Sequence, residues 1–294
     1  MIDTAPLCAP PDFAPRKPRL AFPQNTCDCH AHILGPAAAF AYAANRVYTP
    51  PDCLLPSYRD MLDTLGVTRA VLVQPSVYGT DNDVLLRALA ESRSTFRGVV
   101  VVDCDIDFAS LEKMHAAGVR GVRVNIVDVK DGKGALPVDG LRALATGVAP
   151  LGWHMEFLLH VDQFPNLDED LADFPVDVVF GHLGYMDTEK DLDEPGFQAL
   201  LRFLRRGRSW AKLTGPYRIS KATMPHADVT EFARALIATA PDQIVWGTDW
   251  PHVMMKGTMP NDGDIADLLS EWVPDENLLR KVLVDNPARL YGFE

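Results

Sequence analysis

Short apolar runs alternate with segments of helical spacing along almost the whole chain. The apolar runs predict strands at residues 27–32, 69–74, 98–103, 121–126, 154–160, 176–182, 209–215 and 243–249. Apolar residues that recur at every third or fourth position predict helices at residues 55–65, 83–93, 108–117, 138–149, 168–174, 196–206, 229–240, 265–272 and 276–290. A predicted helix therefore separates each predicted strand from the next.

Strands that are apolar on both faces and alternate with helices are typical of a parallel sheet that helices cover. Eight such units favour an α/β fold of the closed (β/α)8, TIM-type kind over an open doubly wound sheet. No G-x-G-x-x-G or P-loop sequence favours a nucleotide-binding fold. No linker or block of charge divides the chain, so we expect a single barrel domain over residues 26–294.

The first residues have a different composition. Residues 1–25 are rich in proline and contain no long apolar run, so we expect an extended N-terminal arm and neither a signal peptide nor a membrane span. The 294 residues, of which 47% are hydrophobic, are enough to bury a large core.

Charge and cysteine content narrow the partners and the compartment. The formal net charge of −12 argues against nucleic acid or an anionic membrane as a partner. A small anionic substrate is still compatible, because a few arginines can make a pocket locally positive. The five cysteines are odd in number and form no C-x-x-C pair, so we expect reduced thiols and a cytoplasmic location. The sequence predicts no particular oligomeric state.

The first predicted strand carries two histidines two positions apart. Alternation along a strand places Asp28, His30 and His32 on one face, and Cys27 and Cys29 on the opposite, outer face. Two imidazoles that project together could hold a metal ion, or bind and polarise an anionic or carbonyl group. The cysteines are expected to be small buried residues and not metal ligands.

Several other predicted strands also end in polar residues. In a barrel of this type the catalytic groups come from the C-terminal ends of the strands, so these side chains should converge. They are Ser76, Arg123, Asn125, His160, Asp162, His182 and Asp249, with Tyr217 and Arg218 just after the seventh strand.

Two of these residues have alternative interpretations. Asp249 could form a turn or cap a helix, yet a carboxylate at a barrel mouth is also suited to act as a general base. Arg123 could form a structural ion pair, or it could bind a carboxylate of an anionic substrate.

Four segments carry a resemblance to a known family. They are residues 30–32 (His-Ala-His), 181–184, 246–252 and 285–291. Together they resemble the amidohydrolase superfamily, and within it the lactonase branch that includes 2-pyrone-4,6-dicarboxylate hydrolase. The resemblance extends from residue 25 to the end of the chain.

The resemblance implies an enzyme that opens a carboxylated lactone, such as 2-pyrone-4,6-dicarboxylate, in the catabolism of aromatic compounds. It implies that Asp249 is the general base for the attacking water. It further implies that His30, His32 and His182 stabilise the developing oxyanion. The substrate-binding residues that it implies are Arg123, Arg218, Tyr48, Ser76 and, as a further cation, Lys130.

The resemblance leaves the cofactor open. If a metal is present, His30, His32, His182 and Asp249 would hold one Zn²⁺. A two-metal centre is not expected, because the superfamily's carboxylated lysine and bridging glutamate have no evident counterpart. We favour a site that requires no metal, because only two histidines are securely juxtaposed in the sequence.

Three alternatives to this function stay open. The first is a zinc-dependent lactonase for a muconolactone or a sugar-acid lactone. The second is a decarboxylase of the same superfamily, and the third is a barrel that binds a ligand without catalysis. The sequence assigns no role to His154, Glu156 or His160.

Overall fold

The computed structural model describes residues 5–127, 136–255 and 257–294. Eight parallel strands form one sheet whose order follows the sequence: β1 (Cys27–Ala31), β2 (Arg69–Val73), β3 (Phe96–Val100), β4 (Val119–Asn125), β5 (His154–Leu158), β6 (Val178–Phe180), β7 (Ser209–Leu213) and β8 (Ile244–Trp246). Backbone hydrogen bonds from Asp249 to His30 and from His32 to Trp250 join the last strand to the first. The predicted (β/α)8 barrel is therefore confirmed.

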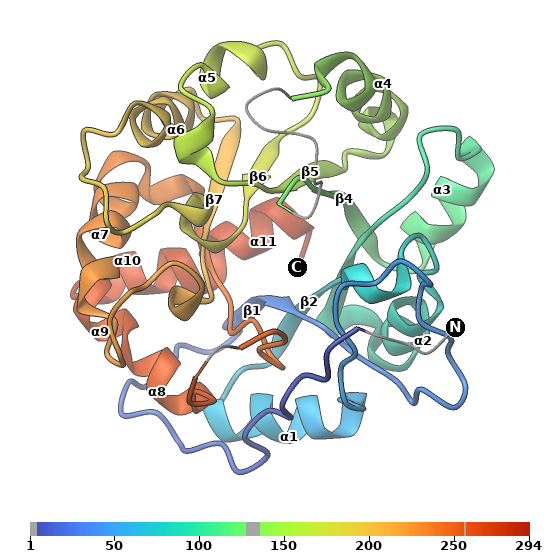
Figure 1. Cartoon of the computed structure of the whole chain (residues 1–294), viewed down its shortest axis with the longest axis horizontal. Coiled ribbons are helices and arrows are strands. Elements are labelled where there is room, and N and C mark those ends of the chain that lie inside the picture. Colours follow the sequence, from blue (N-terminus) through green and yellow to red (C-terminus); the bar gives the residue numbers. More distant parts are fainter. Residues whose placement is uncertain (1–4, 128–135, 256) are drawn as a thin grey trace.

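Helices surround the strands in Figure 1. They are α1 (Leu55–Leu65), α2 (Asp83–Ser92), α3 (Phe108–Ala116), α4 (Val138–Val148), α5 (Leu167–Asp170), α6 (Pro195–Arg205), α7 (Thr230–Thr239), α8 (Asp262–Asp267), α9 (Leu269–Trp272), α10 (Glu276–Arg280) and α11 (Asn286–Tyr291). Helix α1 buries one side with residues three or four apart, as the pattern predicts, and it ends where Gly66 takes a left-handed conformation.

The predicted boundaries fail where the tertiary structure overrides the local pattern. Strands β3 and β4 begin two residues earlier than predicted, because pairing with neighbouring strands extends back to Phe96 and Val119. The helix predicted at 276–290 is divided by a π-helical turn over Lys281–Asp285. Pro287 follows this turn, and its lack of a backbone N–H interrupts regular helical hydrogen bonding.

The interior of the barrel forms a hydrophobic cluster separate from the one under the helices. It contains valines of β2, β3, β6 and β8, together with Cys27 and Cys29 of β1. Tyr291 and Phe293, at the C-terminal end of the chain, pack against this cluster. The alternate strand residues pack with the helices in the larger cluster.

The first strand is irregular, and this corrects the predicted orientation of its side chains. The register of β1 against β2 shifts between Asp28 and Ala31, as at a β-bulge. The extra residue breaks the strict alternation, so Cys29 and His30 both reach the barrel interior. Asp28 instead points outward, where it accepts a hydrogen bond of 2.8 Å from Tyr58 of α1. The prediction that the cysteines lie on the outer face is wrong.

Residues 5–26 form no helix or strand, apart from an isolated bridge between Leu7 and Thr49. The segment packs against α8, where the backbone N–H of Arg16 donates to Asn261 and Arg19 pairs with Asp267. Within the described part of the chain, no helix combines the length and the apolar character that a membrane crossing needs.

Candidate active site

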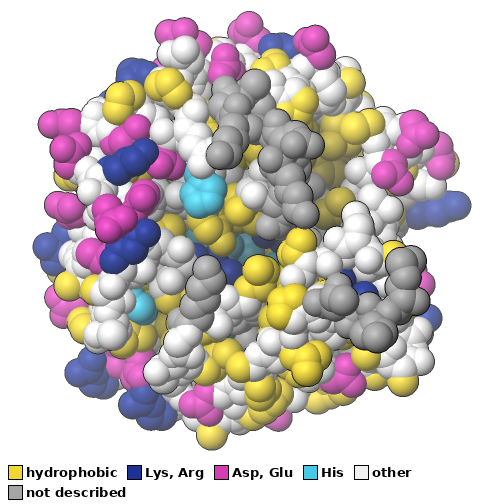
Figure 2. All heavy atoms as spheres, viewed as in Figure 1, with side chains coloured by type: hydrophobic (Ala, Val, Ile, Leu, Met, Phe, Trp, Pro, Cys, Tyr) yellow, Lys and Arg dark blue, Asp and Glu magenta, His cyan; other side chains and the backbone are white. Residues whose placement is uncertain are grey.

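A cavity of about 250 Å³ lies at the C-terminal ends of the strands. Figure 2 shows this face hollowed near its centre, with histidine and cationic side chains deep inside. The predicted residues that line the cavity are His32, Tyr48, Ser76, Arg123, Asn125, His182, Tyr217 and Arg218. His30 and Asp249 lie fully buried beside them. Lys130 lies outside the described residues.

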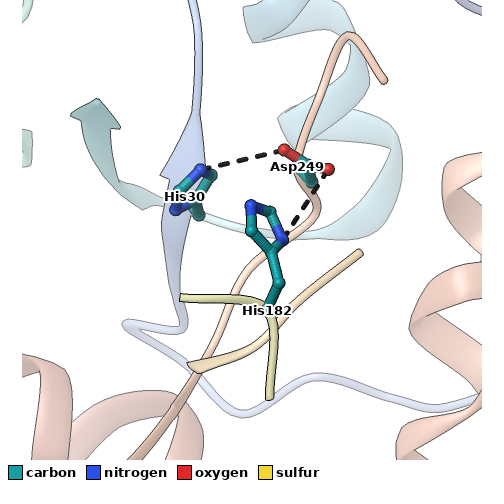
Figure 3. A group of neighbouring side chains, drawn as sticks. All are labelled: His30, His182 and Asp249. Carbon is teal, nitrogen blue, oxygen red and sulfur yellow. Dashed lines mark ion pairs between the residues drawn. The ribbon is translucent and has the colours of Figure 1, made fainter. Parts of the chain in front are cut away.

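Asp249 and three histidines form the centre of the site, and Figure 3 shows Asp249 with two of them, His30 and His182. Oδ1 of Asp249 lies 3.8 Å from Nε2 of His30 and 3.8 Å from Nε2 of His32. Oδ2 lies 4.0 Å from Nδ1 of His182. The predicted catalytic residues, which come from β1 and from the segments after β6 and β8, are therefore brought together.

Backbone conformation after β8 aims Asp249 into the site. Asp249 has a φ of 65°, in the left-handed region that few non-glycine residues adopt. Thr248 holds this turn against the first strand, because its backbone N–H and its hydroxyl donate to Asp28 at 2.9 and 2.6 Å. Strand β1 thus supplies the two histidines and also anchors the carboxylate.

Gly215, just after β7, leaves room for two of these groups. A Cβ atom at this position would lie 2.8 Å from Oδ2 of Asp249 and 2.8 Å from Nδ1 of His182. Gly215 also has a φ of 57°, which glycine adopts without steric cost. The close approach of the carboxylate and the imidazole therefore depends on glycine here.

The carboxylate of Asp249 is ionised, and only one of its two oxygens accepts hydrogen bonds from the described residues. Oδ2 accepts hydrogen bonds from the hydroxyl of Tyr217 at 2.6 Å and from Nε of Arg218 at 2.5 Å. Burial favours the neutral form, but the charge of Arg218 above all holds the pKa of Asp249 well below its usual value. Oδ1 is buried and has no hydrogen-bond partner among the described residues. This oxygen is free to accept a proton from water.

The three histidines are neutral at pH 7. Burial lowers the pKa of His32 to about 4 and that of His182 to about 3, and it lowers the pKa of His30 well below its usual value. Nδ1 of His32 lies 2.7 Å from the carbonyl oxygen of Val73, and Nδ1 of His182 lies 3.3 Å from that of Thr214. Because a carbonyl oxygen only accepts, both rings carry their proton on Nδ1 and present the Nε2 lone pair.

Among the described residues, Arg123 and Arg218 have different partners. Arg218 is already paired with Asp249 and still lines the cavity. One terminal N–H group of Arg123 donates to the carbonyl oxygen of Gln74 at 3.0 Å, and its buried Nε has no partner in the described part of the chain. Tyr48 lies next to Ser76, and burial raises the pKa of its hydroxyl, so Tyr48 is a neutral hydrogen-bonding group.

A model for a protein family described as amidohydrolase matches residues 27–293. The chain belongs to the amidohydrolase family.

Individual relatives of this amidohydrolase act on lactones. The 2-pyrone-4,6-dicarboxylate hydrolase of Comamonas testosteroni is 38% identical over 290 residues, which cover 95% of this chain and 94% of the relative. The 4-sulfomuconolactone hydrolase of Hydrogenophaga intermedia is 33% identical over 293 residues, with coverage of 99% and 96%. A solved structure of a probable 2-pyrone-4,6-dicarboxylic acid hydrolase from Acinetobacter baumannii, with citric acid bound, has a TM-score of 0.82 at 27% identity and covers 92% of this chain and 100% of that one.

One cluster of three side chains, among the described residues of this amidohydrolase, could hold a metal ion. His30, His182 and Asp249 each bring a ligand atom to within 4.8 Å of the others. Two nitrogens and a carboxylate oxygen suit zinc, and Nε2 of His30 and Oδ1 of Asp249 have no other partner among the described residues. Binding through Nε2 requires that this atom of His30 carry no proton.

Strand β5 does not contribute as predicted. His160 interacts through Nδ1 with the carbonyl oxygen of Tyr185, and Asp162 pairs with Lys190, so neither joins the cluster around Asp249. Glu156 reaches the site instead, and its Oε1 lies 3.3 Å from Nδ1 of His30. Alternation along β5 places Glu156 inside the barrel, but no local feature of the sequence indicates that it contacts His30.

Sequence reasoning missed one aromatic residue of the site and the role of another. Tyr185 was not predicted, and it lines the cavity and packs its ring edge-on against His182. Tyr217 was expected near the other strand ends, but its hydrogen bond to Asp249 was not predicted. Both tyrosines lie in irregular segments after strands, where periodicity carries no information on side-chain direction.

Proposed function

We propose that this amidohydrolase opens a carboxylated lactone, similar to 2-pyrone-4,6-dicarboxylate, by attack of water that Asp249 activates. One observation carries the proposal: the ionised carboxylate of Asp249 has one free, buried oxygen that faces Nε2 of two histidines at 3.8 Å. A water molecule next to this oxygen would lie beside groups that can polarise a carbonyl.

The reaction needs one proton to move twice. The water oxygen forms a bond to the lactone carbonyl carbon while Oδ1 of Asp249 takes a proton from the water. The oxyanion that develops is stabilised by an N–H of His30 and by the cationic side chains that line the cavity. The ring C–O bond then breaks, and Asp249 returns the proton to the leaving oxygen. A carboxylate of low pKa is a weak base, so an ester with a good leaving group suits this site.

The cations of the cavity favour a substrate that carries carboxylates. Arg123 has an unpartnered buried N–H, and Arg218 lines the same cavity. A guanidinium group binds a carboxylate through charge-assisted hydrogen bonds, which orient the ring for attack. Tyr48 and Ser76 line the cavity, and in this proposal they donate hydrogen bonds to the same anion. The matches to hydrolases of a pyrone dicarboxylate and of a sulfonated muconolactone agree with an anionic lactone.

A second candidate function is a zinc-dependent lactonase for a muconolactone, because His30, His182 and Asp249 could also bind a metal ion. The specific support is the 33% identity to a 4-sulfomuconolactone hydrolase. A zinc ion held by His30, His182 and Asp249 would polarise the carbonyl as a Lewis acid. Substrate choice and chelator sensitivity separate the two candidates.

A screen of carboxylated lactones tests the proposal. Turnover is measured as loss of ring absorbance, with and without a chelator. We expect turnover of a pyrone dicarboxylate that survives chelation, and a loss of several orders of magnitude in kcat for Asp249→Asn with the fold retained. Asp162→Asn is the matched control, because that carboxylate pairs with Lys190 away from the cavity.

Three results would contradict the proposal. Turnover by Asp249→Asn at the wild-type rate would exclude this residue as the base. Release of carbon dioxide would indicate a decarboxylase. Stoichiometric binding of the lactones without turnover would indicate a binding protein.

A further inference from the structure

An ion pair lies directly behind His30 in the barrel interior. Nζ of Lys212, on β7, lies 2.6 Å from Oε2 of Glu156, on β5, and both side chains are fully buried. Burial raises the pKa of Glu156, but the charges of Lys212 and Arg123 and the hydrogen bond from Lys212 together leave this pKa below its usual value, so the carboxylate is ionised. Neither residue lines the cavity, and both contact His30, which belongs to the site.

The geometry of the ammonium group leaves one N–H for His30. Lys212 donates to Oε2 of Glu156 and, at 2.8 Å, to the backbone carbonyl oxygen of Cys29. These two bonds fix the rotation of the ammonium group, and Nδ1 of His30 lies 3.4 Å from the same Nζ. An ammonium group has no lone pair, so a hydrogen bond here requires that Nδ1 be the acceptor.

Glu156 is the competing partner of the same ring nitrogen. Its Oε1 lies 3.3 Å from Nδ1 of His30 and could accept a hydrogen bond from this nitrogen if the nitrogen carried a proton. In the structure, however, Oε1 of Glu156 has no hydrogen-bond partner among the described residues, whereas Nδ1 of His30 is within hydrogen-bonding distance of Nζ of Lys212. A proton on Nδ1 would also point toward the ammonium group. The contacts therefore favour an unprotonated Nδ1.

We propose that Lys212 fixes His30 as the tautomer with its proton on Nε2, which makes His30 a hydrogen-bond donor to the lactone carbonyl oxygen. Lys212 is thus a positioning residue, and Glu156 holds it in place. The inference rests on the proposed lactonase function only for the identity of the oxygen that His30 contacts. His32 and His182 have the opposite tautomer, because carbonyl oxygens lie behind their Nδ1 atoms.

The tautomer of His30 also determines whether the site can bind zinc through this residue. A protonated Nε2 cannot bind a metal, so the set of His30, His182 and Asp249 is incomplete as a zinc site while Lys212 holds the ring. Transfer of the proton to Nδ1, where Glu156 can accept it, would free the Nε2 lone pair. The pair behind the ring therefore favours direct hydrogen bonding to substrate over metal binding.

Nitrogen-15 NMR of the wild-type protein, labelled at histidine and free of substrate and metal, tests the tautomer directly. Long-range ¹⁵N–¹H correlations identify the protonated ring nitrogen, and loss of signals in His30→Asn assigns them. We expect Nε2–H for His30, and Nδ1–H for His32 and His182. A proton on Nδ1 of His30 in the wild type overturns the proposal.

Two variants then identify the residue that selects the tautomer. Glu156→Gln keeps the ammonium donor and should keep Nε2–H, whereas Lys212→Met should move the proton to Nδ1. Lys212→Met should also raise zinc affinity about 10- to 100-fold in equilibrium dialysis, in the range seen when groups behind a metal ligand change. Lys212→Met leaves the buried carboxylate of Glu156 without its ion-pair partner. If this variant does not fold for that reason, the Lys212→Met/Glu156→Gln double variant replaces it.

The outcomes separate this inference from the proposed function. Retention of Nε2–H after loss of Lys212, or unchanged zinc affinity, overturns the role of Lys212 whatever the activity. The expected tautomers in a protein that opens no lactone support the role of Lys212 and overturn the lactonase function. The NMR readout needs no substrate, so neither result depends on the other.

Discussion

Tyr217 donates a hydrogen bond of 2.6 Å to Oδ2 of Asp249, on the opposite side of the carboxylate from the histidines that face Oδ1. The phenolic oxygen itself lies 2.8 Å from Nδ1 of His252, whose Nε2 lies 3.1 Å from Asp262. Because an ionised carboxylate only accepts, Tyr217 must donate to Asp249 and accept from His252. This chain of side chains fixes which oxygen of Asp249 is free.

Tyr217→Phe should therefore lower kcat with little change in KM. A hydrogen bond to a charged group contributes about 1.5–3 kcal/mol, which corresponds to a fall in rate of roughly 10- to 100-fold if the carboxylate rotates away. Steady-state kinetics on the best lactone measures this effect. Tyr42→Phe is the control, because its hydroxyl contacts the carbonyl oxygen of Pro50. Equal kcat in both variants would show that Tyr217 does not orient the base.

Gly215→Ala should disable the site while costing little stability. The added Cβ would lie 2.8 Å from both Asp249 and His182 and displace one of them, so we expect kcat to fall by about 100-fold, as for other ångström-scale misplacements. Gly66→Ala is a matched control, because it has a similar φ of 78° and no atom within 4 Å of the added Cβ. Both variants should lose about 1 kcal/mol of unfolding free energy, and only Gly215→Ala should lose activity. Wild-type kinetics for Gly215→Ala would contradict this geometry.

Arg123→Met should raise KM for lactones that carry carboxylates and have little effect on neutral lactones. The guanidinium has a buried N–H without a partner among the described residues, which a substrate carboxylate can occupy. Arg218→Met should lower kcat as well, because it also removes the ion pair with Asp249. The KM and kcat of paired charged and neutral lactones provide the measurement. Equal changes for both substrates would rule out carboxylate binding by Arg123.

Stability should rise with pH between about 4 and 6.5, in part through His154. Burial lowers the pKa of this histidine to about 4, below the value of 6.5 for an unperturbed side chain. The unfolded chain then binds more protons across this interval, so the free energy of unfolding increases with pH, by on the order of 3 kcal/mol from this residue. Below pH 4 this contribution is lost.

Urea denaturation of the wild type and of His154→Phe at several pH values between 4 and 7 measures that contribution. His32 and His182 act in the same direction in both proteins, so the difference in slope isolates His154. The variant should show a weaker rise in unfolding free energy. Parallel curves for the two proteins would mean that the pKa of His154 is not lowered.

The sequence alone was sufficient for the architecture and for much of the site. Buried parallel strands must be apolar on both faces, so eight apolar runs separated by helical segments determine a barrel and its order. Polar residues at strand ends, such as His32, Arg123 and His182, then stand out, and the barrel brings them to one cavity.

The tertiary structure decided the orientation and the partners of these side chains. A register shift in β1 places Cys29 in the interior beside His30 and turns Asp28 outward, and no local pattern reveals a bulge that forms against a neighbouring strand. The pairing of Arg218 with Asp249, and of Lys212 with Glu156 behind His30, joins residues far apart in the chain. Spacing along one strand determines which residues can face inward, whereas hydrogen-bond partners and protonation depend on groups that only the closed barrel places within reach.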